Sequence, residues 1–287
     1  MRLVVGASGL LGGRIATGLL DRGDDVRILA RDPASVASLV AAGAQPVAGD
    51  LKDPASLRAA CEGVGTVVTT ANAAQRGGDD SFESVDLHGN AALVDAAAEA
   101  GVERCVFVSA LAADATSPVP LLAAKGATEQ RLQGSEMAWT VLRPDTFMDV
   151  WVPMIVGGPV LSGQPVTLVR DGARVHSFVA VDDVAAYAVG AVDHPAAADA
   201  VLAIGGPEPV SWRDVVAAFE AELGREVPVR WIDPGEPVPG IPAVVHPLVW
   251  AFETYDSPLD MSGLSATFGV TPTPLADYVR GFVQAAT

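Results

Sequence analysis

Three glycines spaced three residues apart follow directly on a short apolar run at the start of the chain. The run covers residues 3–5, the glycines are Gly6, Gly9 and Gly12, and helix-compatible sequence continues from Leu10. A strand, a tight turn and a helix in this order leave the free N–H groups of the helix start available to a phosphate. The spacing differs from the more common G-x-G-x-x-G, so a strand–helix turn without a ligand is the alternative interpretation. The loop predicted to bind phosphate consists of Gly6, Ala7, Ser8, Gly9, Leu10, Leu11 and Gly12.

Short apolar runs alternate with helical patterns through the first half of the chain. We expect strands at 2–5, 25–30, 45–48, 66–70, 104–108 and 138–142, and helices near 10–22, 33–42, 54–61, 81–100 and 121–134. Several of the runs are almost continuously apolar, as are strands that are buried on both faces of a parallel sheet. This alternation predicts an α/β fold with a doubly wound parallel sheet, the Rossmann fold.

The pattern changes after Pro144. We expect helices at 146–155, 182–192 and 212–223, and strands at 175–181 and 200–204. Five prolines between 233 and 247 exclude one regular helix there and predict a loop over a pocket. The chain is therefore expected to contain a nucleotide-binding domain over 1–150 and a smaller substrate-binding part over 151–287, in which 175–205 returns to the sheet.

Acidic residues outnumber basic ones by 35 to 18, which gives a formal charge of −17. Such a surface repels nucleic acid phosphates and anionic lipid, so neither nucleic acid nor membrane is an expected partner. No apolar run is long enough to span a bilayer, and no leader-like segment precedes the first strand. Cys61 and Cys105 form no redox or metal motif, and although a disulfide between them is open, a reducing compartment is the simpler interpretation. We expect a soluble, cytoplasmic protein.

Arg31 stands at the carboxyl tip of the second expected strand. An acidic residue at this position would hold the ribose 2′-hydroxyl of NAD, whereas an arginine suits the 2′-phosphate of NADP. Asp32 follows at once, so the acidic residue is displaced and not absent, and an ordinary solvated loop arginine is the other interpretation. The sequence favours NADP(H) over NAD(H) as cofactor.

Eight segments occur in an order that is typical of one protein group. They read GASGLLGG, ILARDP, VAGDLKDP, VVTTANA, CVFVSA, LLAAKGATEQRL, WTVLRPDTFM and HSFVAVDDVA. In these segments the chain resembles the NmrA-like group of the atypical short-chain dehydrogenase/reductase superfamily. The resemblance covers most of the chain and is weakest after about residue 210. It implies a Rossmann fold and a nicotinamide dinucleotide as ligand.

The resemblance also implies roles for individual residues. Ser109 occupies the serine position of the family, and Lys125 matches its active-site lysine, which holds the nicotinamide ribose; both are candidate catalytic residues. The positions implied to line the remaining cofactor are Asp50, Leu51, Thr70, Ala71, Asn72, Pro144 and Phe147. The first two of these would lie by the adenine and the last two by the nicotinamide, although Asp50 is equally typical of a turn.

One position departs from the pattern of the superfamily. Where Tyr stands four residues before the lysine elsewhere, this chain has Leu121, which has no proton to donate. The tyrosines of the chain are Tyr187, Tyr255 and Tyr278, all outside the first half. Three alternatives follow: Lys125 acts as acid and base itself, the substrate needs little proton donation, as a quinone would, or the protein binds NADP(H) without chemistry.

The function predicted first is an NADP(H)-dependent oxidoreductase that reduces a small apolar quinone, enone or ketone. Met148, Trp151 and Tyr255 are candidate substrate-binding residues, although aromatic and methionine side chains on such segments also serve as core. The alternative is a non-catalytic NADP(H) sensor that regulates a partner, and a sugar-nucleotide epimerase is disfavoured because the Tyr and a basic C-terminal region are missing. No residues have metal-ligand spacing, so no metal is expected, and a homodimer stays open.

Overall fold

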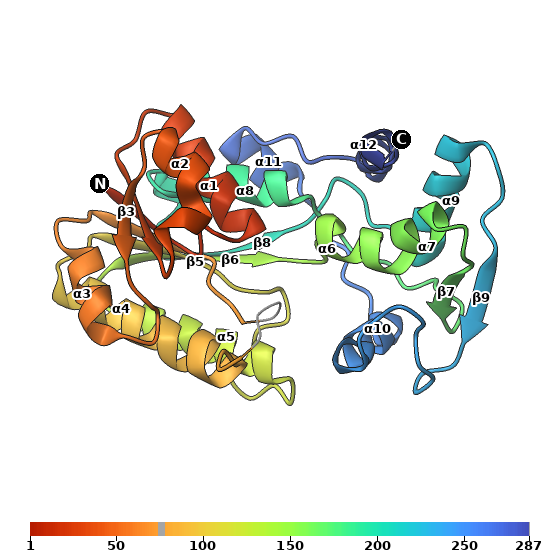
Figure 1. The fold of residues 1–287 in the computed structure, drawn as a ribbon, viewed down its shortest axis with the longest axis horizontal. Helices are drawn as coiled ribbons and strands as arrows, with labels where there is room; N and C mark the ends of the chain where they lie inside the picture. Colours follow the sequence, from red (N-terminus) through yellow and green to blue (C-terminus); the bar gives the residue numbers. More distant parts are fainter. Residues whose placement is uncertain (74–77, 287) are drawn as a thin grey trace. The chain divides into compact units, whose positions relative to one another are not determined.

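The computed structural model describes residues 1–73 and 78–286. The chain divides into two compact units (Figure 1). The first contains Met1–Pro144 and Val184–Ala203, and the second contains Asp145–Asp183 and Ile204–Thr287. The division at Pro144 precedes the expected boundary near 150. The segment that returns to the first unit is also shorter than the expected 175–205, because residues 175–183 belong to the second unit.

A seven-stranded sheet in the order β3-β2-β1-β4-β5-β6-β8 organises the first unit within the described residues. Its strands are β1 (Arg2–Val5), β2 (Val26–Ala30), β3 (Gln45–Ala48), β4 (Thr66–Thr69), β5 (Arg104–Val108), β6 (Ala138–Pro144) and β8 (Ala200–Ile204). The pairs from β3 to β6 are parallel, with Leu3 opposite Arg27 on one side and Val67 on the other. This arrangement is the predicted Rossmann fold, with 200–204 added at its edge as expected.

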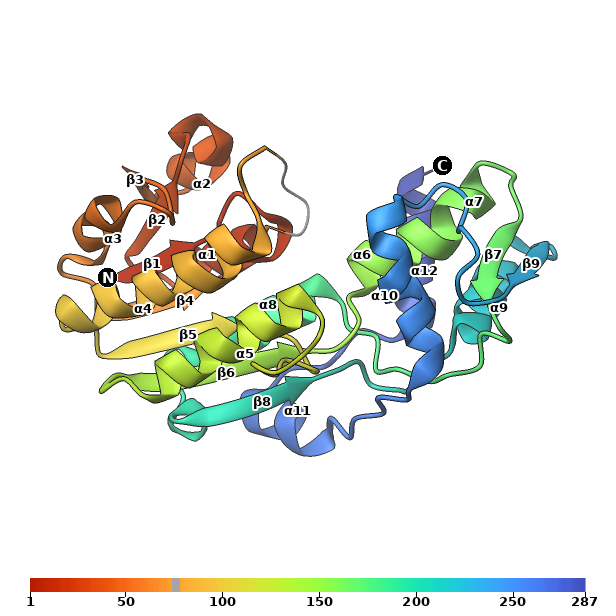
Figure 2. The same ribbon diagram turned by 90° about the horizontal axis from the view of Figure 1, so that it is seen from below.

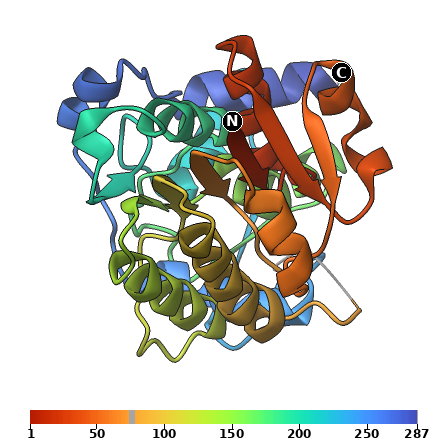
Figure 3. The ribbon, with the colours of Figure 1, turned by 90° about the vertical axis from the view of Figure 1, so that its left-hand side faces the viewer.

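Helices cover both faces of this sheet. They are α1 (Leu10–Asp21), η1 (Pro33–Val36), α2 (Ala37–Ala41), α3 (Pro54–Cys61), η2 (Phe82–Gly89), α4 (Asn90–Glu99), α5 (Pro120–Gln133), α8 (Val181–Ala191) and η4 (Pro195–Ala197). In Figure 1, α1 and α8 lie on one face and α4 and α5 on the other. Figure 2 and Figure 3 both show α4 and α5 side by side. The helix expected over 81–100 begins as the π-helix η2, which Ser81 and Ser84 cap reciprocally.

The elements form where local sequence and burial agree. Strands β1, β4 and β5 are buried almost throughout, as the apolar runs predicted. Asp53 caps α3 by accepting from the Ala55 N–H, and Pro54 occupies the first turn, where its missing N–H costs nothing. Cys61 and Cys105 are free and buried in the core, and burial raises the pKa of the Cys61 thiol to about 11 and that of Cys105 to about 12.

In its described residues, the second unit consists of short helices and one parallel strand pair. Its elements are α6 (Met148–Val152), η3 (Pro153–Gly157), α7 (Gly158–Leu161), β7 (Val166–Val169), α9 (Trp212–Leu223), β9 (Val229–Ile232), η5 (Ala243–Val245), α10 (His246–Ala251), η6 (Phe252–Thr254), α11 (Ser262–Phe268) and α12 (Leu275–Ala286). Strands β7 and β9 pair with Val166 opposite Val229. Buried apolar side chains from α6, α9 and α12 form one core.

Two expectations for this unit are corrected. The segment 175–181 forms no strand, because only isolated bridges join His176 to Val210 and Ser257, and Val179 to Phe147. The helix expected over 146–155 begins later, at Met148, and its regular part ends at Val152. Pro153 has no N–H for the next α-helical hydrogen bond, and the chain continues as the π-helix η3.

Candidate dinucleotide-binding site

The glycine loop lies where the strand order of the sheet reverses, between β1 and β4. Gly6 follows β1 with φ of +92°, a conformation that L side chains rarely adopt. A Cβ atom on Gly6 would lie 2.6 Å from Oγ1 of Thr70, the residue that follows β4. A Cβ atom on Gly12 would lie 2.3 Å from the Gly6 carbonyl oxygen. Glycine is therefore required at both positions for helix, turn and sheet to approach this closely.

The start of α1 presents main-chain N–H groups to the surface. Its N-cap residue Gly9 is extended, and no side chain caps the helix. The N–H groups of the first turn have no partner within a helix, so a phosphate at this point gains both hydrogen bonds and the favourable helix dipole. Ser8, Gly9 and Leu10 are exposed, while Gly12 is buried against the sheet. The loop therefore has the form that a diphosphate needs.

A Gly12→Ala substitution is expected to distort this loop. The added Cβ must displace the Gly6 carbonyl, and overpacking of this kind costs about 1–3 kcal/mol. We expect a lower thermal unfolding midpoint and at least tenfold weaker dinucleotide binding, measured by differential scanning fluorimetry and calorimetric titration. Gly281→Ala on α12 is the matched control, because a Cβ there meets no atom within 4 Å. Unchanged binding in the Gly12 variant would contradict the role given to the loop.

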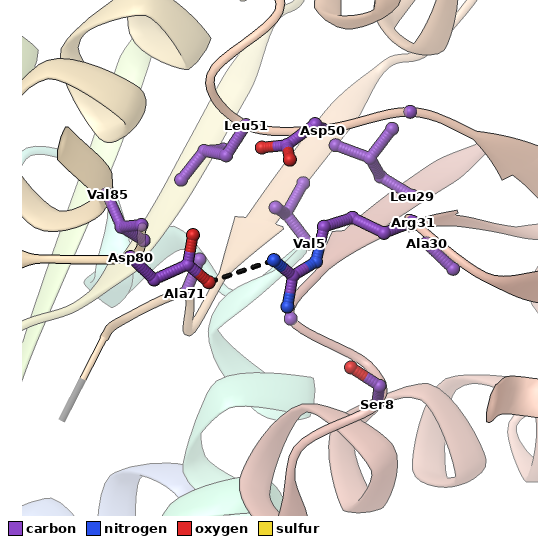
Figure 4. A pocket seen from close by; sticks show the side chains of 12 residues that line it. Val5, Ser8, Leu29, Ala30, Arg31, Asp50, Leu51, Ala71, Asp80 and Val85 are labelled. Carbon is purple, nitrogen blue, oxygen red and sulfur yellow. Dashed lines mark hydrogen bonds and ion pairs between the residues drawn. The ribbon is translucent and has the colours of Figure 1, made fainter. Parts of the chain in front are cut away.

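An open cavity begins at the glycine loop and follows the carboxyl ends of β1, β2 and β4 (Figure 4). The empty space between its lining residues is about 450 Å³, a figure that includes open solvent. Its lining residues are Val5, Gly6, Ser8, Leu29, Ala30, Arg31, Gly49, Asp50, Leu51, Ala71, Asp80 and Val85. The structure thus brings together Gly6, Ser8, Arg31, Asp50, Leu51 and Ala71, six residues that the sequence placed at the cofactor.

Arg31 is not free in this cavity. Its Nη1 lies 2.9 Å from Oδ2 of Asp80, and Nζ of Lys52 lies 2.7 Å from Oδ1 of the same carboxylate. Asp80 raises the pKa of Lys52 by hydrogen bonding to its ammonium. Sequence reasoning missed Asp80 and Lys52. Lys52 directly follows Asp50 and Leu51, which were predicted to lie by the adenine. This proximity in sequence is the signal that could have placed Lys52 at the site.

Other predicted cofactor residues have clear local roles. Asp50 Oδ1 accepts from the Lys52 N–H at 2.8 Å, which is the turn geometry that was its alternative interpretation. Asn72 donates from Nδ2 to the Thr70 carbonyl oxygen at 3.2 Å. The Pro144 carbonyl oxygen ends β6 and accepts from the Leu111 N–H at 3.1 Å.

Lys125 lies on α5 at the carboxyl end of β5. Its side chain is almost completely buried, and Nζ donates to the Val108 carbonyl oxygen at 2.9 Å. Nζ also lies 5.2 Å from the centre of the Phe107 ring. Burial lowers the pKa of the ammonium below its usual range, while the carboxylates of Asp86 and Glu129 oppose that shift. Lys125 is therefore a buried cation whose proton is held less tightly than that of a surface lysine.

Ser109 belongs to a buried ionic network. Its hydroxyl donates to Oε1 of Glu129, and Arg143 donates to the same carboxylate from Nε at 3.0 Å and from Nη2 at 2.5 Å. Glu129 stands four residues after Lys125, one helical turn along α5. Sequence reasoning missed Glu129 and Arg143, although the spacing from the lysine would have placed Glu129 on the same helix face.

The residues predicted to contact substrate lie in the second unit, as does Phe147. Met148 is 1% exposed and belongs to the core. Trp151 packs edge-on against Phe252 with ring centres 4.9 Å apart and keeps part of its surface exposed. Tyr255 is 42% exposed, and its ring centre lies 5.1 Å from that of His176.

His176 itself is fully buried in a polar network. Nδ1 lies 2.8 Å from the Ser257 hydroxyl, which donates to Asp145 Oδ2 at 2.8 Å, and Nε2 lies 2.9 Å from the Phe252 carbonyl oxygen. Burial raises the pKa of the Asp145 carboxyl. These bonds tie the segment after β6 to the loop after η6. The arrangement gives His176 a structural role.

No helix within 1–73 and 78–286 has both the length and the apolar character to cross a bilayer. In the same part of the chain, His, Cys, Asp and Glu side chains do not gather in a group of three that could hold a metal ion.

Ligands of parallel α/β sheets bind outside the carboxyl ends of the strands, next to the point where the strand order reverses. The glycine turn, the uncapped start of α1 and the cavity all lie at that point in this sheet. This coincidence places the chain in the class of Rossmann-type dinucleotide-binding proteins. The glycine turn and the uncapped helix start fit the diphosphate of such a cofactor, and the cavity lies directly beside them.

The chain belongs to the NAD(P)H-binding family, whose profile matches residues 6–195. It is 32% identical over 232 residues to the NAD(P)H azoreductase of Xenophilus azovorans, covering 81% of this chain and 76% of the relative. It is also 32% identical over 180 residues to the photosystem II assembly factor Ycf39 of Cyanophora paradoxa, covering 63% of this chain and 56% of the relative. These findings confirm the resemblance to the NmrA-like, atypical short-chain dehydrogenase/reductase class.

The fold is also that of a solved reductase. The crystal structure of an NADPH-dependent quinone oxidoreductase from Escherichia coli, complexed with NADPH, has a TM-score of 0.83 with this chain. The two chains share 20% sequence identity, and the match covers 99% of this chain and 100% of the other. This likeness confirms the predicted fold class.

Proposed function

We propose that this protein is an NADP(H)-dependent reductase of a small apolar acceptor such as a quinone, an enone or a ketone. The observation that carries the proposal is the cavity that joins the glycine turn to Arg31 at the carboxyl edge of the sheet. The names of the azoreductase and the quinone oxidoreductase to which the chain is similar agree with a reductase of this kind.

The residues of the first unit have distinct tasks in this proposal. The main-chain N–H groups at the start of α1 hold the diphosphate, and Arg31 holds the 2′-phosphate. Asp50 and Leu51 border the adenine. The strand ends contribute Thr70, Ala71 and Asn72 along the cofactor and Pro144 at its nicotinamide end. Phe147 belongs to the second unit, and its role at the cofactor stays a prediction from the sequence. Glycine-loop residues Ala7 and Leu11 complete the turn.

A bound nicotinamide cofactor supplies the hydride, and the protein positions the acceptor and supplies charge. Lys125 is the proposed proton donor at the end of β5, because burial lowers the pKa of its ammonium. Ser109 lies at the same strand end, with its hydroxyl oriented by Glu129. A ketone takes its proton from Lys125, whereas a reduced quinone can take protons from water. Trp151 and Tyr255 of the second unit are both partly exposed, and their role as substrate contacts stays a prediction from the sequence.

Arg31→Ala is expected to weaken NADPH binding far more than NADH binding. A charge-assisted hydrogen bond to a phosphate contributes about 1.5–3 kcal/mol, which corresponds to about a 10- to 100-fold loss of affinity. NADH has no 2′-phosphate, so its affinity should change less than about threefold. Fluorescence titration with both reduced cofactors measures the two dissociation constants. Equal losses for the two cofactors would contradict the assignment of Arg31.

The decisive test of the proposed activity is turnover. Purified protein is incubated with NADPH and a panel of quinones, enones, ketones and an azo dye, and the loss of absorbance at the nicotinamide band is followed. We expect oxidation of NADPH with at least one acceptor class. If NADPH binds tightly but no acceptor is reduced, the proposed reductase activity is rejected.

That outcome would favour the second candidate, an NADP(H)-binding regulator without catalysis. Two observations support it: Leu121 stands at the position where a proton-donating Tyr is usual, and one relative is named an assembly factor. A regulator should bind its protein partner with an affinity that depends on whether NADPH or NADP is bound.

A further inference from the structure

Two cations from different segments converge on a single carboxylate in the cavity. Figure 4 shows Arg31, which follows β2, pointing toward Asp80, which precedes the cap of η2. Arg31 Nη1 lies 2.9 Å from Asp80 Oδ2, and Lys52 Nζ lies 2.7 Å from Asp80 Oδ1. Each oxygen of the carboxylate therefore accepts from a different cation.

The exposure of the three side chains differs sharply. The Asp80 side chain is 4% exposed, whereas those of Arg31 and Lys52 are 49% and 31% exposed. Asp80 therefore occupies the inner position of the group, and the cations keep solvent-accessible surface. A phosphoryl group resembles this carboxylate in two respects. It is negatively charged, and it has adjacent oxygens that can accept hydrogen bonds from a planar guanidinium and an ammonium.

We propose that Arg31 and Lys52 together form the 2′-phosphate site, that the Asp80 carboxylate occupies this anion site in the unliganded protein, and that Asp80 thereby sets the preference between NADPH and NADH. The proposal rests on the proposed function, because it assumes that the cavity binds a nicotinamide dinucleotide. It adds Lys52 as a second phosphate-binding cation. It makes Asp80 a specificity-determining residue.

The two cofactors differ in what they require of Asp80. A 2′-phosphate carries negative charge and must displace the carboxylate from the two cations or tolerate its repulsion, so Asp80 reduces the affinity for NADPH. The ribose of NADH has a neutral 2′-hydroxyl, which leaves both ion pairs intact and can donate to a carboxylate. Arg31 and Lys52 favour NADPH over NADH, and Asp80 therefore makes this difference in affinity smaller.

The test compares Asp80→Asn with Asp79→Asn, which changes the net charge equally at an exposed neighbouring position. Dissociation constants for NADPH, NADH and adenosine 2′-phosphate are measured by calorimetry at one fixed ionic strength. We expect Asp80→Asn to bind NADPH and adenosine 2′-phosphate about tenfold more tightly than Asp79→Asn does. NADH affinity should change less than about threefold, so the NADH-to-NADPH ratio of dissociation constants should increase.

A second variant tests the other half of the proposal without removing a buried group. Lys52→Ala should weaken NADPH and adenosine 2′-phosphate by about tenfold and leave NADH within about threefold. This variant keeps the proposal testable if Asp80→Asn proves too unstable to purify, which its thermal unfolding midpoint would reveal.

The outcomes separate this inference from the proposed function. If the native protein binds neither NADPH nor NADH, the proposed function fails and the inference fails with it. If both cofactors bind but Asp80→Asn leaves their ratio unchanged, the inference alone is overturned. Weaker NADPH binding in Asp80→Asn would overturn it as well, because Asp80 would then position the two cations instead of competing with the phosphate.

Discussion

Lys125→Ala should reduce the turnover of a ketone by about 100-fold or more, because proton donation by a positioned side chain contributes about 10²–10⁴ to a rate. The side chain is 7% exposed, and its Nζ donates to the Val108 carbonyl oxygen. A quinone needs no proton from the protein, so its turnover should fall by less than about tenfold. Comparing kcat for the two acceptors in native and variant protein measures the contribution of the lysine as an acid.

The pH dependence gives a second readout for the same residue. An acid acts in its protonated form, so ketone turnover should fall as the pH rises through the pKa of Lys125. Burial lowers that pKa, and the fall should therefore occur below lysine's ordinary value of 10.5. In Lys125→Ala this fall of turnover at high pH, the alkaline limb of the pH profile, should disappear. Lys125→Met is the control that keeps the apolar stem, and retention of the limb in the methionine variant would show that another group donates the proton.

Glu129→Ala should destabilise the protein by about 3 kcal/mol, the second large effect expected. Glu129 is nearly buried and accepts from Ser109 and Arg143, and removal of one partner of a buried ion pair typically costs about 3–5 kcal/mol. We expect the lower end of this energy range because the Arg143 side chain is 29% exposed, so water can partly solvate its charge. Urea denaturation, with the slope checked for constancy, measures the change in unfolding free energy.

Two variants serve as controls for this measurement. Glu129→Gln keeps an acceptor for both donors and should lose about 1 kcal/mol. Glu136→Ala removes an exposed acidic side chain, and we expect a change within about 0.5 kcal/mol. If Glu129→Ala were as stable as Glu136→Ala, the network would contribute nothing to stability, and its role would be limited to orienting Ser109.

Much of the first unit could be predicted because its signals are local. The strand Arg2–Val5 is apolar from Leu3 onward, and Asp53 followed by Pro54 marks the start of a helix. The glycine spacing predicted the tight turn between a strand and a helix, and the structure has that turn. Arg31 could be assigned to the cavity because it follows a strand whose end is defined by its own sequence.

The failures concern elements whose conformation depends on distant partners. Residues 175–181 have the composition of a strand, but no continuous partner strand lies beside them in the described structure, and single bridges to Val210, Ser257 and Phe147 are formed instead. Asp80 lies outside every motif, and only the folded chain brings its carboxylate to Arg31 and Lys52. Glu129 and Arg143 stand 14 residues apart and meet only through the packing of α5 on β6.

The sequence by itself determined the Rossmann sheet, the glycine turn and the nucleotide class, since each depends on residue types that are neighbours along the chain. Tertiary structure alone decided which charges face one another: the Arg31–Asp80–Lys52 group, the burial of Lys125, and the contact of Ser109 with Glu129. The physical reason is that backbone conformation responds to nearby residues. Charge pairing and desolvation, in contrast, depend on which segments the fold brings together in space.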